Sequence, residues 1–89
     1  MELPVYPKLH IPEEDRSTAI TQEQGEFIYG FLREKQLQKT LEIGLGYGTS
    51  AAHIMAATED VHYVIVPFQE VRFANRGFIN LQQLGFEDR

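Results

Sequence analysis

The residues best suited to chemistry lie in one short segment, Leu41 to Ser50, which reads LEIGLGYGTS. An acid and three glycines follow an E-x-G-x-G-x-G pattern within it: Glu42, Gly44, Gly46 and Gly48. Glycine permits backbone φ angles above zero, and it lacks the Cβ atom that would keep a ligand away from the main chain. A helix that begins behind such a turn adds free N–H groups and partial positive charge. The segment therefore predicts a loop that binds an anionic or dipolar ligand of the nucleotide-cofactor type.

Two strands and a helix are expected to position this loop. The run Thr40 to Ile43 is too short for a helix and stops at a glycine, which is typical of a buried strand. A helix is expected from about Thr49 to Thr58, and its alanines favour close packing on a sheet. The run Val61 to Val66, VHYVIV, is β-branched and aromatic with apolar residues on both faces. We expect it to be an interior strand of a helix-covered sheet.

A helix is also expected before the first strand. Thr21 and Gln24 have the spacing of a capping box, in which each side chain accepts a hydrogen bond from the other residue's free backbone N–H. Four apolar residues then recur at helical spacing: Phe27, Ile28, Phe31 and Leu32. Because Gly25 and Gly30 lower the intrinsic stability of this helix by up to about 1 kcal/mol each, packing has to hold it.

The last predicted helix runs from about Glu70 to Leu84. Its apolar positions share one stripe: Val71, Ala74, Phe78 and Leu81. Gly85 follows where a left-handed C-terminal cap is expected. Phe73 and Phe78 are expected in the core or an interface.

The alternation of helices and strands predicts an α/β fold. Strands that alternate with helices favour a right-handed βαβ crossover and a parallel pair. Each strand of a two-stranded sheet has an outer edge with unpaired N–H and C=O groups, which can pair with another chain. We therefore expect a homo-oligomer, such as a homodimer, formed through exposed strand edges.

Length and composition limit the other classes of function. The chain has 89 residues, 43% apolar residues and a net charge of −5, which fit one ordinary globular domain. The first 19 residues contain Pro4, Pro7 and Pro12 and are expected to form an N-terminal arm before the domain of residues 20–89. Scattered basic residues argue against nucleic acid as a partner. Without a long apolar run, a signal-peptide pattern or cysteine, the expected location is cytoplasmic and not a membrane.

The spacing of the glycines separates two classes of cofactor. The dinucleotide fingerprint has two residues between its last two glycines, whereas here only Tyr47 separates Gly46 from Gly48. A nicotinamide cofactor is accordingly the weaker match. A third interpretation is a tight turn whose glycines only allow the strand and the helix to pack closely.

The stretch from Ile20 to Arg89 resembles the opening of a class I S-adenosylmethionine-dependent methyltransferase, within that class the small-molecule O-methyltransferases of the catechol type. The resemblance is carried by the helix ITQEQGEFIYGFL, the loop LEIGLGYGTSAAHIMA and the helix ending LQQLGF. It implies a Rossmann-like βαβα fragment with two parallel strands flanked by helices. It also implies S-adenosylmethionine as cofactor and a small-molecule substrate for the parent enzyme.

The resemblance also implies which residues bind the cofactor: Glu42, Gly44, Leu45, Gly46, Tyr47, Gly48 and Ser50. In the family, the residue that matches Ser50 contacts the methionine carboxylate. Glu42 matches the acid that helps to hold the methionine end. Tyr47 either lies beside the cofactor or shields the turn. The resemblance assigns no catalytic residue in this chain, and the spacing of His10, His53 and His62 argues against a metal site.

The chain departs from the family pattern at the end of the second strand. The family has Asp or Glu there to receive the ribose hydroxyls, and this chain has Val66. Loss of a charge-assisted hydrogen bond weakens binding by about 1.5 to 3 kcal/mol. Glu70 offers a substitute only if it reaches the ribose from the next helix.

The second departure concerns the later strands, from which the family takes its substrate pocket, catalytic base and metal ligands. The sequence ends at Arg89, where a third strand is expected. We therefore expect the N-terminal portion of a methyltransferase, inactive alone. The alternative is a non-catalytic, self-associating Rossmann-like fragment that has lost its cofactor site.

Overall fold

The computed structural model describes residues 2–65 and 75–86 of the chain. Two short 3-10 helices open it, and helices then alternate with strands. The elements are η1 (Tyr6–Lys8), η2 (Glu13–Thr18), α1 (Gln22–Lys35), β1 (Thr40–Ile43), α2 (Thr49–Ala57), β2 (His62–Ile65) and α4 (Arg76–Gln83). The described part of the chain is therefore a small α/β unit.

The two strands form one parallel sheet. Thr40 pairs with His62 and Ile43 pairs with Ile65, with α2 as the connection between the strands. This confirms the predicted parallel pair flanked by helices, and the predicted bounds of the first strand are those observed. The second strand begins one residue later than predicted, at His62, and Val66 lies outside the described residues.

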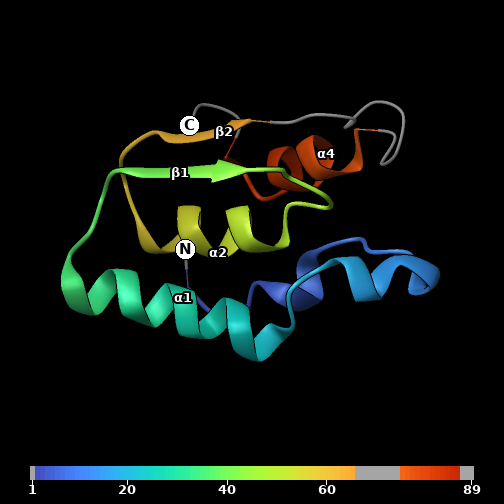
Figure 1. Cartoon of the computed structure of the whole chain (residues 1–89), viewed down its shortest axis with the longest axis horizontal. Helices are drawn as coiled ribbons and strands as arrows, with labels where there is room; N and C mark the ends of the chain where they lie inside the picture. The colour runs from blue at the N-terminus through green and yellow to red at the C-terminus, as the bar shows by residue number, and fades with distance from the viewer. Residues whose placement is uncertain (1, 66–74, 87–89) are drawn as a thin grey trace.

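The helix α2 lies between the sheet and α1 in Figure 1. Its small residues are buried, which lets its neighbours approach closely: Ala51, Ala52 and Ala56. On the side of α1, the fully buried ring of His53 lies against Gly25. A Cβ atom built on Gly25 would lie 2.5 Å from two atoms of that ring, so only glycine allows α1 and α2 to pack this closely.

The predicted capping box of α1 is confirmed. The backbone N–H of Gln24 donates to Thr21 Oγ1 at 3.1 Å, and the N–H of Thr21 donates to Gln24 Oε1 at 2.9 Å. Only part of the predicted apolar stripe faces the core. Leu32 is buried, whereas the rings of Phe27 and Phe31 stack on each other at 6.2 Å and are exposed by 71% and 44%.

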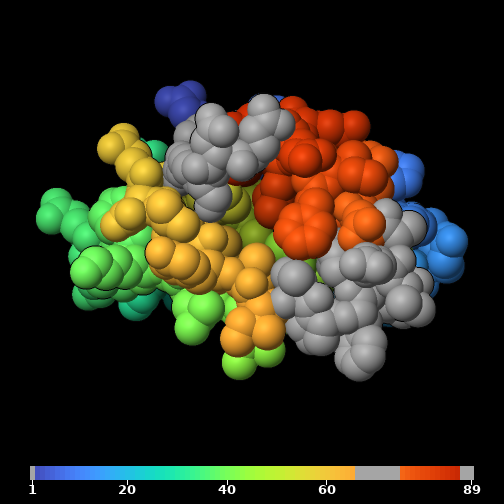
Figure 2. All heavy atoms as spheres, turned by 90° about the horizontal axis from the view of Figure 1, so that it is seen from above, coloured from blue at the N-terminus to red at the C-terminus, as the bar shows by residue number. Residues whose placement is uncertain are grey.

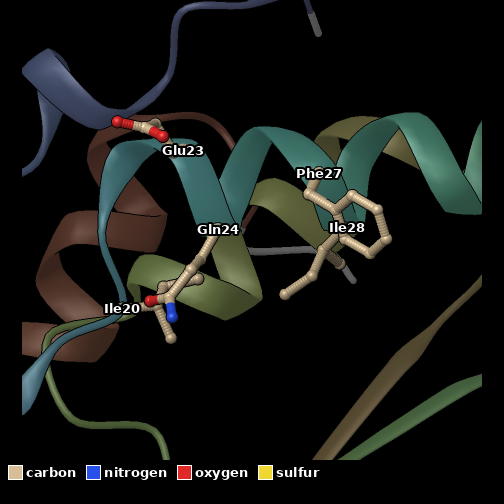
Figure 3. Close-up of a pocket in the computed structure, with 5 residues that line it drawn as sticks. All are labelled: Ile20, Glu23, Gln24, Phe27 and Ile28. Carbon is tan, nitrogen blue, oxygen red and sulfur yellow. The ribbon is translucent and has the colours of Figure 1, made fainter.

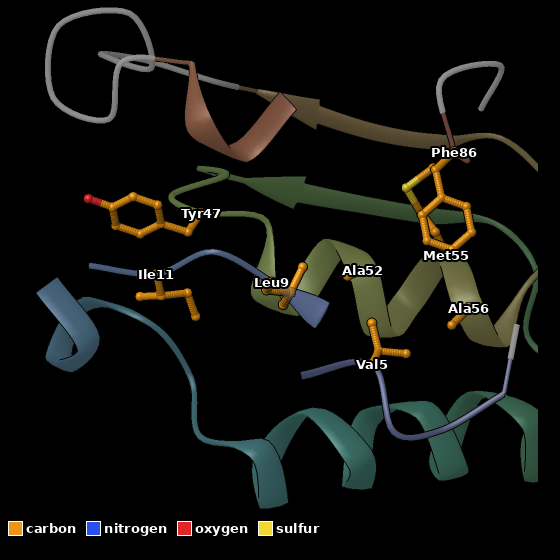
Figure 4. Packing of buried hydrophobic residues seen from close by; sticks show 8 residues of the cluster. All are labelled: Val5, Leu9, Ile11, Tyr47, Ala52, Met55, Ala56 and Phe86. Atoms are coloured by element: carbon orange, nitrogen blue, oxygen red, sulfur yellow. The ribbon is translucent and has the colours of Figure 1, made fainter. Parts of the chain in front are cut away.

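The N-terminal arm supplies part of the hydrophobic core. The cluster in Figure 4 joins arm, loop, α2 and C-terminal residues: Val5, Leu9, Ile11, Tyr47, Ala52, Met55, Ala56 and Phe86. The side chain of Asn80 in α4 ties these parts together, since Asn80 Nδ2 donates to the carbonyls of His10 and Tyr47 and Oδ1 accepts from the N–H of His10. Residues 2–19 thus fold onto their own chain in the described structure.

The prediction of one continuous helix from Glu70 to Leu84 is wrong at Asn75. Its φ angle of 58° is left-handed, so α4 begins only at Arg76. Of the predicted stripe, Val71 and Ala74 lie outside the described residues, as do Glu70 and Phe73.

The C-terminal cap of α4 follows the prediction. Gly85 has a φ of 86°, and the N–H of Phe86 donates to the carbonyl of Leu81 at 3.0 Å. Of the two described stripe residues, Leu81 packs against the core, while Phe78 is 38% exposed.

The sheet has one covered and one open face. The residues that point away from α2 are 55% to 81% exposed: Leu41, Ile43, Tyr63 and Ile65. The space-filling view in Figure 2 shows β2 in orange open to view beside α4 in red. The prediction of an interior strand with both faces covered is therefore wrong for β2. None of the helices in the described ranges is both long and apolar enough to cross a membrane.

Candidate functional site

The glycine-rich loop joins the carboxyl end of β1 to the N-terminus of α2. The N–H of Gly44 still pairs with the carbonyl of Ile65, and the N–H of Gly48 closes a turn on the carbonyl of Leu45 at 2.9 Å. The three glycines have φ angles of 91° (Gly44), 57° (Gly46) and 83° (Gly48). An L-residue adopts this region at a cost of about 1 to 2 kcal/mol, so the loop conformation itself requires the glycines.

The surroundings of the glycines differ along the loop. A Cβ atom built on Gly48 would lie 3.1 Å from the carbonyl oxygen of Gly77, so this glycine permits close packing of the loop on α4. On Gly44 or Gly46 a Cβ atom would meet no described atom within 4 Å. Packing therefore explains Gly48, whereas the main chain at Gly44 and Gly46 faces open space.

That open space is a pocket of about 310 Å³. It lies between the loop and the approach to α1, and its volume falls at the lower end of the range for small-molecule sites. The residues that line it are Thr18, Ala19, Ile20, Ile43, Gly44, Leu45, Gly46, Tyr47, Thr49 and Ser50. Five of the seven predicted binding residues are in this set, while Glu42 and Gly48 are not.

The N-terminus of α2 opens onto this pocket. The first backbone bond of the helix runs from the N–H of Ala52 to the carbonyl of Gly48, and within the described chain no side chain caps it. The N–H groups of Thr49 and Ser50 are therefore not used by the helix. The hydroxyl of Thr49 is buried and has no hydrogen-bond partner among the described residues. Donors for an anionic group thus gather at this end of the pocket.

Glu42 lies on the covered face of the sheet and accepts two hydrogen bonds. Ser50 Oγ donates to Glu42 Oε2, and His62 Nε2 donates to Glu42 Oε1 at 2.7 Å. His62 Nδ1 in turn lies 2.7 Å from Thr40 Oγ1. The side chains of His62 and Glu42 are 1% and 16% exposed, so this chain of bonds links β1, β2 and α2 in a largely buried place.

The charged side chain beside the pocket is the carboxylate of Glu42. The described residues that line it include no Lys, Arg, Asp or Glu, and the carboxylate of Glu42 stands directly behind Ser50. A cationic group beside Ser50 is favoured by this carboxylate, while an anionic group is favoured at the free N–H groups of α2. The arrangement suits a zwitterion.

Tyr47 turns its ring toward the arm and the core. Its side chain is buried with Ile11 and Leu9 (Figure 4). Its hydroxyl donates to Asp15 Oδ2 at 2.5 Å. Tyr47 also lines the loop pocket, so its position fits both predicted roles, beside a cofactor and as a shield of the turn. The structure therefore gives Asp15 and Asn80 a part in holding the loop, and the sequence reasoning missed both. The amide of Asn80, a weak helix former among the apolar residues of α4, was the available signal.

The sequence reasoning also missed His62 as a partner of the loop acid. The parallel register places His62 opposite Thr40 on the face that carries Glu42. His53 is buried against α1 with Nδ1 on the carbonyl of Thr49, and His10 is exposed near α4. The three histidines are thus in separate surroundings, and among the described residues no group of three or more His, Cys, Asp or Glu could hold a metal ion.

A second hollow adjoins the pocket along α1. Figure 3 shows the residues that line it: Ile20, Glu23, Gln24, Phe27 and Ile28. Its volume is about 450 Å³, and Ile20 borders both hollows. The loop pocket and this largely apolar hollow on the first helix therefore share Ile20 at their border.

The comparisons with known proteins leave the site to be interpreted from its geometry. No protein-family model matches the chain, and no curated protein matches it.

Proposed function

We propose that this chain is the S-adenosylmethionine-binding portion of a class I methyltransferase that acts on a small molecule, and that it transfers no methyl group by itself. The observation that carries the proposal is the open space in front of Gly44 and Gly46, both in conformations that favour glycine. If these glycines served only packing, other atoms would fill the space in front of them. A ligand that lies against the main chain would occupy that space.

The groups around the pocket fit the methionine end of this cofactor. That end carries an ammonium and a carboxylate on the same carbon. The N–H groups at the start of α2 offer donors to the carboxylate, and Glu42 with Ser50 offers negative charge to the ammonium. The ribose-binding position, Val66, lies outside the described residues, so the proposal rests on the methionine end.

The proposed reaction limits what this portion contributes. Methyl transfer is an in-line displacement at the sulfonium, for which the protein mainly positions two reactants and excludes water. The loop holds the donor. The described residues that line the pocket include no His, Lys, Asp or Glu to serve as a base, so we assign the acceptor half of the reaction to other parts of the parent enzyme.

The test is titration calorimetry with S-adenosylmethionine and S-adenosylhomocysteine. We expect saturable binding that Gly46→Ala weakens by about tenfold or more, because a Cβ atom there enters the space of the ligand. Gly85→Ala is the matched control: Gly85 also has a positive φ with open space around it, but it caps α4 away from the pocket. Absence of heat at millimolar ligand contradicts the proposal for this chain.

The open face of the sheet favours a second candidate function, that of a non-catalytic, self-associating unit. Leu41, Ile43, Tyr63 and Ile65 are 66%, 81%, 65% and 55% exposed, and together they present on the order of 400 Å² of apolar surface. A stable complex buries about 800 Å² on each partner. Pairing at the outer edges of β1 and β2 supplies further contact, so a second copy of this chain is the occupant that the sheet itself suits.

Sedimentation velocity over a wide range of concentration tests this second function. We expect a concentration-dependent dimer. The protein is loaded at about a micromolar and at concentrations up to about 100 times higher, a range that spans about 2.7 kcal/mol of association free energy. A monomer at every one of these concentrations contradicts the proposed self-association.

A further inference from the structure

We infer that His62 and Thr40 are positioning residues that fix the hydroxyl of Ser50 as a hydrogen-bond acceptor, so that the loop pocket selects a ligand with an ammonium group at this point. The inference rests on the function proposed above and specifies which ligand group each side of the pocket recognises. Its basis is the chain of hydrogen bonds that joins Thr40, His62, Glu42 and Ser50 behind the loop.

The direction of the bond between His62 and Glu42 follows from the chemistry of the two groups. A carboxylate only accepts hydrogen bonds, so His62 Nε2 carries a proton and donates it to Glu42 Oε1. The other ring nitrogen, Nδ1, lies 2.7 Å from Thr40 Oγ1, so the imidazole is held at both of its nitrogens. Each of these groups has a partner, which a nearly inaccessible imidazole requires.

The same reasoning fixes the proton of Ser50. Its hydroxyl has one hydrogen, and that hydrogen is directed to Glu42 Oε2. Only lone pairs are left for the pocket, so this hydroxyl receives a donor group and cannot also donate to a carboxylate. The carboxylate contact that the family resemblance implies for Ser50 then falls to the backbone N–H groups of Thr49 and Ser50.

His62 matters because a hydroxyl turns freely when its acceptor moves. Glu42 is held at one oxygen by His62 and at the other by Ser50. Without the imidazole, the carboxylate is free to rotate and the Ser50 hydrogen is free to turn toward the pocket. The recognition of an amine at Ser50 therefore depends on a residue that lies behind the pocket and does not line it.

The experiment compares two ligands that differ only in the amine. S-adenosylhomocysteine carries the amino and carboxylate groups, and its deaminated analogue keeps the carboxylate alone. Calorimetry measures both ligands on wild type, His62→Leu, His62→Gln and Thr40→Val. His10→Leu is the matched control, because His10 is exposed and its side chain has no part in the site.

We expect His62→Leu to weaken S-adenosylhomocysteine binding by about five- to tenfold and to change binding of the deaminated analogue by less than about twofold. His62→Gln restores the preference, since its amide N–H reaches Glu42 in place of Nε2. Thr40→Val keeps the branched shape and the strand propensity, so it tests the same chain, with an expected loss of about threefold, even if His62→Leu does not fold.

The outcomes separate this inference from the function on which it rests. Equal weakening of both ligands indicates a purely structural role for His62 and overturns the inference alone. Unchanged binding of both ligands by folded variants also overturns it. A wild-type protein that binds neither ligand overturns the proposed function and the inference together.

Discussion

The two faces of the small sheet invert the usual arrangement of apolar and polar side chains. The covered face carries Glu42 and His62, held in a hydrogen-bonded chain against α2. The open face carries Leu41 and Ile65 in contact with solvent. A sheet that were complete in itself would place its apolar residues inside and its acid outside. The covered face thus carries the polar partners of the loop, and the open face carries the apolar surface on which the proposed self-association depends.

The largest effect on unfolding free energy is expected from Glu42→Ala on the covered face. The substitution leaves the buried donor of His62 and the hydroxyl of Ser50 without their acceptor, which costs about 3 kcal/mol of unfolding free energy. Urea denaturation with an unchanged m-value measures it. Glu59→Ala, at an exposed acid after α2, serves as control with an expected change within about 0.5 kcal/mol. Equal losses for the two variants would mean that the chain of hydrogen bonds contributes nothing to stability.

The next effect concerns the layer beneath the covered face. Gly25→Ala places a methyl group against the buried ring of His53, and we expect a loss of about 2 kcal/mol from overpacking. Gly30→Ala in the same helix has no described atom within 4 Å of the new Cβ atom, so it is expected to raise stability by up to about 1 kcal/mol. Thermal and urea unfolding of the pair measure both. Stabilisation by Gly25→Ala would contradict the close contact of α1 with α2.

The open face gives a smaller, association-dependent effect. Ile65→Thr keeps a β-branched side chain but removes apolar surface, and we expect self-association to weaken by about tenfold with little change in monomer stability. Val64→Thr on the covered face is the control, for which stability changes and association does not. Sedimentation equilibrium measures the dimer dissociation constant. Identical constants for wild type and Ile65→Thr would remove this face from the interface.

The smallest expected effect is that of truncating an exposed leucine on the open face. Leu41→Ala removes a side chain that is 66% exposed, so it costs less than about 1 kcal/mol in the monomer, whereas a buried leucine costs about 2 to 5 kcal/mol. Urea denaturation at low protein concentration measures it. A loss above about 2 kcal/mol would show that the face is covered in solution.

Local rules predicted the elements that depend on a few neighbouring residues. The capping box at Thr21, the strand Thr40–Ile43 and the left-handed cap at Gly85 are as expected, because hydrogen bonds and φ preferences within a few residues decide them. The continuous last helix failed at Asn75, since asparagine tolerates the left-handed region that ends a helical pattern.

The candidate site divides in the same way. The sequence by itself determined the loop: its glycines, their positive φ angles and its position between a strand and a helix follow from residue type and spacing. The partners of the loop, above all His62 and Asn80, lie 20 and 33 residues away from Glu42 and Tyr47. Only the tertiary structure decided them, because strand register and helix packing bring together side chains that no local pattern connects.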